Sequence, residues 1–161
     1  MSDTSNFRIL VLGLGSEALT DDGVPVKIIE DLKIILDSRY FDLQTNITGG
    51  LDLVDILKDH HKAVIIDTTK TPGRIPGDVT ISKYPDLKES FHLTNTHGVS
   101  IQQVMEMGIK LGFMMPLEVL VITIEISDNL QISNEFSPEI SSSYCKTVIQ
   151  IKEKIESFLN S

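Results

Sequence analysis

Cysteine is almost absent from this chain, because Cys145 is the single one among 161 residues. One cysteine cannot close an internal disulfide or build a thiolate cage around a metal ion. Cys145 lies beside the apolar positions of the last expected helix, which predicts a small buried side chain rather than a nucleophile. Internal disulfide scaffolds and cysteine-ligated metal sites are therefore excluded.

Basic side chains are also scarce, since 14 lysines and arginines face 23 aspartates and glutamates for a formal net charge of -9. Binding to a phosphate backbone depends on clustered lysine and arginine, and no basic cluster offsets the negative charge locally. The composition therefore predicts no nucleic-acid partner.

Long hydrophobic runs are missing, and the apolar segments have the length of strands rather than of membrane spans. The first residues, Met1–Asn6, lack the basic and apolar regions of a signal peptide. We expect a cytoplasmic protein with no membrane association. A chain of 161 residues with 41% hydrophobic content predicts one domain over residues 1–161 with a substantial core, and we expect a monomer.

Two common hydrolase motifs are absent as well. The chain contains no H-E-x-x-H zinc motif and no G-x-S-x-G nucleophile motif. His60, His61 and His92 belong to no motif. The sequence therefore predicts neither a zinc protease with an H-E-x-x-H helix nor a serine hydrolase with a G-x-S-x-G nucleophile turn.

What the chain does contain is an alternation of apolar strands and amphipathic helices. Periods of two or unbroken apolar runs indicate strands, and apolar residues three or four apart indicate helices. Parallel neighbouring strands need crossover helices, so this order predicts a three-layer α/β/α sandwich with a mostly parallel twisted sheet. The expected strands are 7–12, 41–48, 63–66, 78–84 and 117–124, and the expected helices are 24–36, 53–57, 101–111 and 140–158.

The segment Gly13–Ala18 matches the loose dinucleotide pattern G-x-G-x-x-G/A. In that motif the helix opens directly on the glycines, where its free N–H groups face a pyrophosphate. Here Pro25 and the turn residues Thr20–Gly23 predict a helix that begins only near Asp22. The loop is long and acidic, so dinucleotide binding is the less favoured alternative.

Three polar residues follow or precede the expected elements where α/β folds place their chemistry. Asp22 follows the first strand, Asp67 ends the third, and His97 stands just before a helix. Two carboxylates and an imidazole suit a divalent ion such as nickel or zinc, with open positions for substrate. The same residues also fit a helix cap, a turn and an ordinary polar loop, and from the pattern alone this structural interpretation is the favoured one. Asp21 is expected to be a solvated loop acid, with support of the site residues as the alternative.

Five short motifs, in order and with suitable spacing, make nearly the whole chain resemble the hydrogenase maturation endopeptidases. They are Gly13–Ser16, Leu19–Val24, Thr48–Gly50, Ile65–Asp67 and Asn95–His97. Ser16 stands where the family commonly has asparagine, and Thr48 stands where it often has an acid.

The resemblance implies an endopeptidase that removes the C-terminal extension of a nickel-iron hydrogenase large-subunit precursor after nickel insertion. It implies that Asp22, Asp67 and His97 are the catalytic and metal-binding residues, and that Gly49 and Gly50 face the substrate. The metal would be nickel supplied by the precursor, with cadmium or zinc as substitutes in vitro. A non-catalytic nickel-sensing or chaperone module on the same fold is the alternative from another functional class.

Overall fold

The fold is an α/β arrangement of nine elements, seen in a computed structural model that describes residues 8–47, 49–86, 99–127 and 131–161. The strands are β1 (Ile9–Leu14), β2 (Phe41–Asn46), β3 (Lys62–Thr69), β4 (Val79–Tyr84) and β5 (Glu118–Glu125). The helices are α1 (Val24–Ile35), α2 (Leu53–Leu57), α3 (Ile101–Lys110) and α4 (Pro138–Leu159).

The strands form one sheet in the order β2-β1-β3-β5-β4. Parallel pairing joins β2, β1, β3 and β5, whereas β4 pairs antiparallel with β5 at the edge of the sheet. The unbroken apolar runs of β1 and β3 are buried on both faces, as central parallel strands require. β3 continues through Asp67 to Thr69, three residues beyond its expected end.

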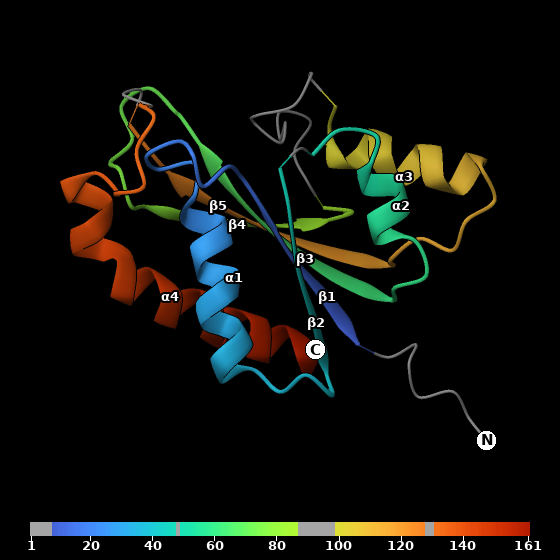
Figure 1. The fold of residues 1–161 in the computed structure, drawn as a ribbon. Coiled ribbons are helices and arrows are strands. Elements are labelled where there is room, and N and C mark those ends of the chain that lie inside the picture. Colours follow the sequence, from blue (N-terminus) through green and yellow to red (C-terminus); the bar gives the residue numbers. More distant parts are fainter. Residues whose placement is uncertain (1–7, 48, 87–98, 128–130) are drawn as a thin grey trace.

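Helices cover both faces of the sheet, which confirms the three-layer sandwich (Figure 1). Val64 and Ile66 of β3 pack on the face covered by α1 and α4, while Ala63 and Ile65 pack on the face covered by α2 and α3. This alternation follows from the period of two in a strand. The polar residues that continue β3 are therefore also divided between the two faces.

The beginnings of α1 and α3 bear on the sequence predictions. A capping box starts α3, because the Ser100 hydroxyl accepts from the Gln103 N–H at 3.2 Å and the Gln103 side chain accepts from the Ser100 N–H at 2.8 Å. Helix α1 begins at Val24, as expected from the turn residues before it, and its N-cap residue is Gly23, with no side-chain cap. Asp22 thus lies one residue before the N-cap position rather than at it.

The prediction for Cys145 is wrong, because its side chain is exposed on α4. The buried stripe of this helix runs through Ile140, Val148 and Ile151, and Cys145 lies outside it. Among the described residues, no helix combines the length and the apolar character needed to cross a membrane.

Candidate functional site

Asp22 and Asp67 lie at the same end of the sheet, the one formed by the carboxyl ends of the strands. Asp22 is on the loop that follows β1, and Asp67 is near the end of β3. These strands are adjacent and parallel, so their carboxyl ends coincide, which is where α/β sheets place their ligand sites. Both side chains are almost fully buried, with exposed fractions of 6% and 2%.

Thr68 connects the two acids. Its hydroxyl donates to Asp22 Oδ1 at 3.2 Å, and its backbone N–H donates to Asp67 Oδ1 at 2.8 Å. The other oxygen of Asp22 accepts from the Ser16 N–H at 2.9 Å. Hydrogen bonds of this kind offset the cost of burying a carboxylate, so they fix where both groups lie. Thr68 was not among the predicted site residues, although its position directly after Asp67 in a strand places its side chain on the opposite face.

The glycines of the first loop have a steric function. A Cβ at Gly13 would lie 2.7 Å from Ile29 Cγ1 and 2.8 Å from the Pro25 carbonyl oxygen, and a Cβ at Gly15 would collide with the Asp22 carbonyl oxygen. The absence of side chains lets α1 and the acidic loop fold closely onto β1. Because the Asp22 carboxylate already accepts the Ser16 N–H, the loop does not present this amide to a phosphate.

The expectation that Asp21 is a solvated loop acid is wrong. Its side chain is 1% exposed, and its Oδ1 accepts from the Ser137 N–H at 2.8 Å, just before α4. Alongside it, the Thr20 N–H donates to the Gln131 carbonyl at 2.9 Å. Segments more than a hundred positions apart in the chain therefore clamp the loop that carries Asp22, and no local pattern predicts such a contact.

Glu125 is a further buried acid at this edge that sequence analysis missed. Its carboxylate accepts from the Thr71 N–H, its backbone N–H donates to the Asp78 carbonyl at 2.8 Å, and its carbonyl accepts from the Gly77 N–H at 2.8 Å. Glu125 thus holds both ends of the loop that follows β3. This loop is fixed close to the end of the strand that carries Asp67.

The remaining predicted site residues are less informative. His97 lies outside the described residues. Gly49 is buried, and Gly50 is half-buried and accepts from the Leu53 N–H at 3.0 Å at the start of α2. In the described part of the chain no three histidine, cysteine, aspartate or glutamate side chains cluster as a metal site would require. Asp22 and Asp67 are the two predicted ligands whose positions are known.

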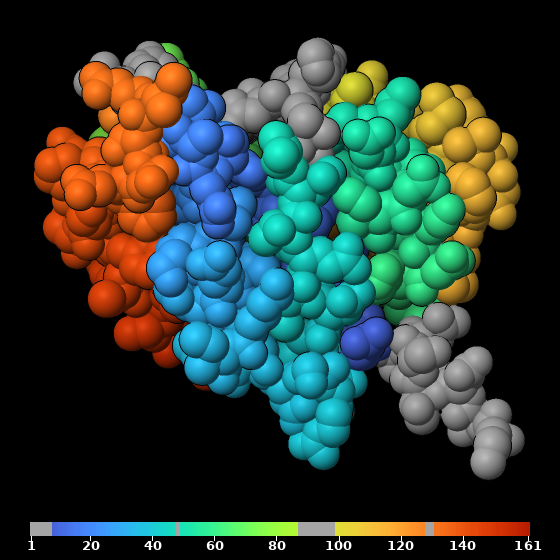
Figure 2. Space-filling view, in the orientation of Figure 1, coloured from blue at the N-terminus to red at the C-terminus, as the bar shows by residue number. Residues whose placement is uncertain are grey.

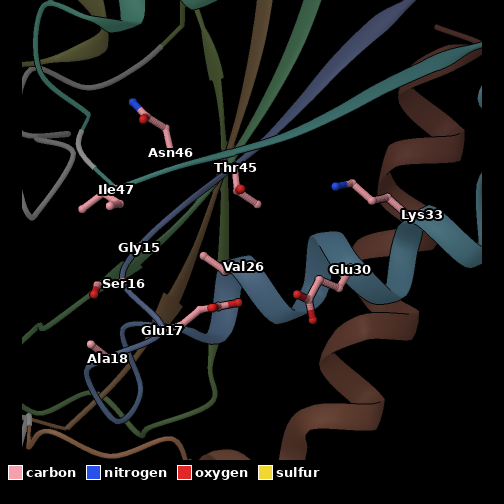
Figure 3. Close-up of a pocket in the computed structure, with 10 residues that line it drawn as sticks. All are labelled: Gly15, Ser16, Glu17, Ala18, Val26, Glu30, Lys33, Thr45, Asn46 and Ile47. Atoms are coloured by element: carbon pink, nitrogen blue, oxygen red, sulfur yellow. The ribbon is translucent and has the colours of Figure 1, made fainter.

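A cleft of about 570 Å³ opens beside the carboxyl end of the sheet, between the end of β2 and α1 (Figure 3). Val26, Glu30 and Lys33 form its helical side, and the loop after β1 closes one end. The cleft shares Ser16 with the site, because the Ser16 N–H binds Asp22. Its lining consists of Gly15, Ser16, Glu17, Ala18, Val26, Glu30, Lys33, Thr45, Asn46 and Ile47.

Several known proteins are similar to this chain in sequence or fold. The hydrogenase 2 maturation protease of Escherichia coli is 30% identical over 86 residues, which is 52% of this chain and 52% of that protein, so the match spans about half of the relative's length. The hydrogenase maturating endopeptidase HybD from E. coli has the same fold, with a TM-score of 0.73 at 22% identity and coverage of 93% of both chains.

Two further solved structures come from archaea. A hydrogenase 2 maturation peptidase from a Thaumarchaeota archaeon superposes with a TM-score of 0.61 at 24% identity, covering 92% of this chain and 98% of that chain. A [NiFe] hydrogenase maturation protease from Thermococcus kodakarensis gives 0.63 at 19% identity, covering 91% of each. Beyond the fold, the family model described as hydrogenase maturation protease matches residues 26–154. This chain therefore belongs to the hydrogenase maturation protease family.

Proposed function

We propose that this protein is an endopeptidase that removes the C-terminal extension of a nickel-iron hydrogenase large-subunit precursor after nickel insertion. Asp22, Asp67 and His97 bind the nickel that the precursor carries, so the metal is part of the substrate. The observation that carries the proposal is the pair of buried carboxylates held by Thr68 at the carboxyl edge of the sheet, in a chain of this family.

The chemistry of the acids supports a role beyond structure. Buried carboxylates destabilise a fold unless they are paired or hydrogen-bonded, and burying two at one edge is costly where an apolar pair would pack well. Oxygen ligands from Asp22 and Asp67 and an imidazole from His97 suit nickel or zinc. Three protein ligands leave coordination positions open for the substrate.

The metal then supplies the chemistry of cleavage. A divalent ion bound next to a peptide bond polarises the scissile carbonyl or activates a water molecule. The catalytic class is accordingly metal-dependent, with carboxylates as ligands, and a precursor without nickel has nothing for these residues to engage. Cleavage should therefore depend on nickel in the substrate.

The direct test is cleavage of the cognate precursor, followed as a mobility change of the large subunit with and without nickel loading. We expect Asp22→Asn, Asp67→Asn and His97→Ala each to abolish processing of the nickel-loaded precursor while circular dichroism shows a folded protein. Asp55→Asn is a matched control, because Asp55 is an exposed acid on α2 that forms an ion pair with Lys58 on the surface.

The outcomes separate the possible functions. Equal cleavage of nickel-free and nickel-loaded precursor would refute the dependence on metal but leave a protease. No cleavage of any cognate precursor, combined with nickel binding, would favour a nickel-sensing or chaperone module. Nucleotide titration tests the dinucleotide alternative, for which no binding is expected.

Metal binding by the isolated protein provides a second test. We expect weak binding of cadmium, zinc or nickel by titration calorimetry, since three ligands without a thiolate make an open site. Asp67→Asn and His97→Ala should each reduce the affinity, and unchanged affinity in both variants would contradict the ligand assignment.

Two finer expectations, a monomer and a cytoplasmic location, are tested by light scattering and by cell fractionation.

A further inference from the structure

The outer edge of β2 has no partner strand in the part of the chain that the structure describes. Among the described residues, β2 is the first strand in the sheet order and pairs with β1 alone. The Tyr40 carbonyl accepts from Ile9 at 2.8 Å and the Asn46 carbonyl accepts from Gly15 at 3.1 Å, so even-numbered backbone groups face β1. The N–H and C=O groups of Leu43 and Thr45 therefore point away from the sheet. A row of outward backbone groups is a template for an added strand.

The cleft in Figure 3 lies beside the last part of this edge, where residues 45–47 line it and α1 forms its side wall. Val26, Glu30 and Lys33 lie at intervals of four and three residues on α1, so they form one stripe parallel to the groove. Seven helical residues span about 10 Å, which matches about three residues of an extended peptide. In the space-filling view, β2 and α1 lie side by side on the exposed face (Figure 2).

The groove is continuous with the proposed site. Ser16 lines the cleft, and its N–H binds the Asp22 carboxylate. Strands are spaced by about 4.8 Å, so a peptide added beside β2 would be about 14 Å from β3, a distance that four or five extended residues cross. One chain can therefore occupy the groove and present a peptide bond near Asp67.

We propose that the C-terminal extension of the precursor binds as an additional strand on the outer edge of β2, with its side chains along the α1 wall of the cleft. This inference rests on the proposed function, because it names the part of the substrate that the site receives. Backbone hydrogen bonds to Leu43 and Thr45 supply affinity for an extended chain, and Val26, Glu30 and Lys33 supply side-chain selectivity. Other occupants, such as a second copy of this chain, would appear as dimerisation at the same edge.

The first experiment uses proline to remove one outward donor. Thr45→Pro deletes an N–H that β1 does not use, and edge strands tolerate proline, so the sheet should persist. With nickel-loaded precursor we expect KM to rise at least tenfold, kcat to change less than twofold, and the circular dichroism spectrum to be unchanged. The wild-type protein should show a similarly raised KM for a precursor whose extension is trimmed to fewer than five residues beyond the cleaved bond.

Val79→Pro is the matched control on the opposite edge of the sheet. The Glu125 N–H donates to the Asp78 carbonyl at 2.8 Å, so the next residue, Val79, points its N–H away from β5. We expect a KM equal to that of the wild type. Equal KM values for Thr45→Pro, Val79→Pro and the wild type would overturn docking on β2 and leave the protease intact.

Amide hydrogen exchange tests the same inference without relying on cleavage or on a variant. The probe is a synthetic peptide with the sequence of the cognate extension, added in excess to the wild-type protein. We expect slower exchange at Leu43 and Thr45 and no change at Gln44, whose N–H faces β1. Failure of the wild type to cleave any precursor would refute the proposed function, whereas unchanged exchange at Leu43 and Thr45 would refute edge docking. Dimerisation with unchanged exchange on peptide addition would assign the edge to a second copy instead.

Discussion

At the scale of single residues, the site depends on contacts that few side chains can make. The Thr68 hydroxyl lies 3.2 Å from Asp22 Oδ1, and its N–H lies 2.8 Å from Asp67 Oδ1. Groups that orient metal ligands commonly change metal affinity or activity by 10–100-fold when they are removed. Thr68 is thus a positioning residue for the proposed site.

Thr68→Val and Thr68→Ser separate the hydroxyl from the shape of the side chain. We expect Thr68→Val to lower metal affinity or precursor cleavage by about tenfold, because Asp22 loses a donor. Thr68→Ser keeps the donor and should retain most of the activity. Calorimetric metal titration of both variants measures the difference, and equal losses would show that packing rather than the hydroxyl matters.

Two glycines of the predicted motifs should differ in their response to alanine. A Cβ at Gly15 would collide with the Asp22 carbonyl oxygen, so Gly15→Ala should destabilise the fold by more than about 1 kcal/mol. A Cβ at Gly50 meets nothing within 4 Å, so Gly50→Ala should unfold at the wild-type denaturant concentration. If Gly50 faces the substrate, KM should still rise. Wild-type kinetics in a stable Gly50→Ala protein would contradict that role.

At the scale of elements, α1 and α4 are tied together on one face of the sheet. The Tyr144 hydroxyl donates to Asp31 at 2.6 Å, and Lys27 donates to the other oxygen of the same carboxylate at 2.8 Å. Lys27 and Tyr144 lower the pKa of Asp31 below its ordinary value of 3.8. Burial, followed by the bond to Asp31, raises the pKa of Tyr144. This link holds α4 against the helix that follows the Asp22 loop.

Tyr144→Phe should destabilise the protein by about 1–2 kcal/mol at pH 7, because it removes a hydrogen bond to a charged group. A carboxyl with a lowered pKa stabilises the fold above its unfolded-state pKa, and this contribution is lost as the pH falls through the folded value. The difference between wild type and variant should therefore shrink below pH 3.8. Urea unfolding at pH 7 and pH 3 measures it, and a difference that grows in acid would contradict the assignment.

At the scale of the whole molecule, the carboxyl and amino ends of the strands differ in function. The carboxyl end carries the buried acids, whereas the amino end is closed by contacts to the C-terminus. There the Lys62 ammonium donates to the Phe158 carbonyl at 3.2 Å and to the Ser161 carbonyl at 2.6 Å. This end therefore contributes to stability rather than to the proposed chemistry.

Lys62→Ala tests this separation. We expect a loss of about 1 kcal/mol in the free energy of unfolding, since the bonds lie near the surface. Cleavage of nickel-loaded precursor should keep the wild-type kcat and KM. A variant with normal stability and impaired cleavage would show that the amino end takes part in function.

Much of the architecture could be predicted from the sequence, because periodicity is a local signal. The apolar runs of β1 and β3 indicated buried parallel strands. Strand and helix ends were less accurate, as β3 extends to Thr69, because apolar content does not mark where pairing stops.

The sequence by itself determined the order of the elements and placed Asp22 and Asp67 after strands that end at one edge. Only the tertiary structure decided that Asp21 is buried against Ser137, that Thr68 reaches Asp22, and that Cys145 faces solvent. The physical reason is the distance along the chain over which each interaction acts. Hydrophobic periodicity is encoded within a few residues, whereas the partner of a polar side chain depends on which distant segments pack beside it.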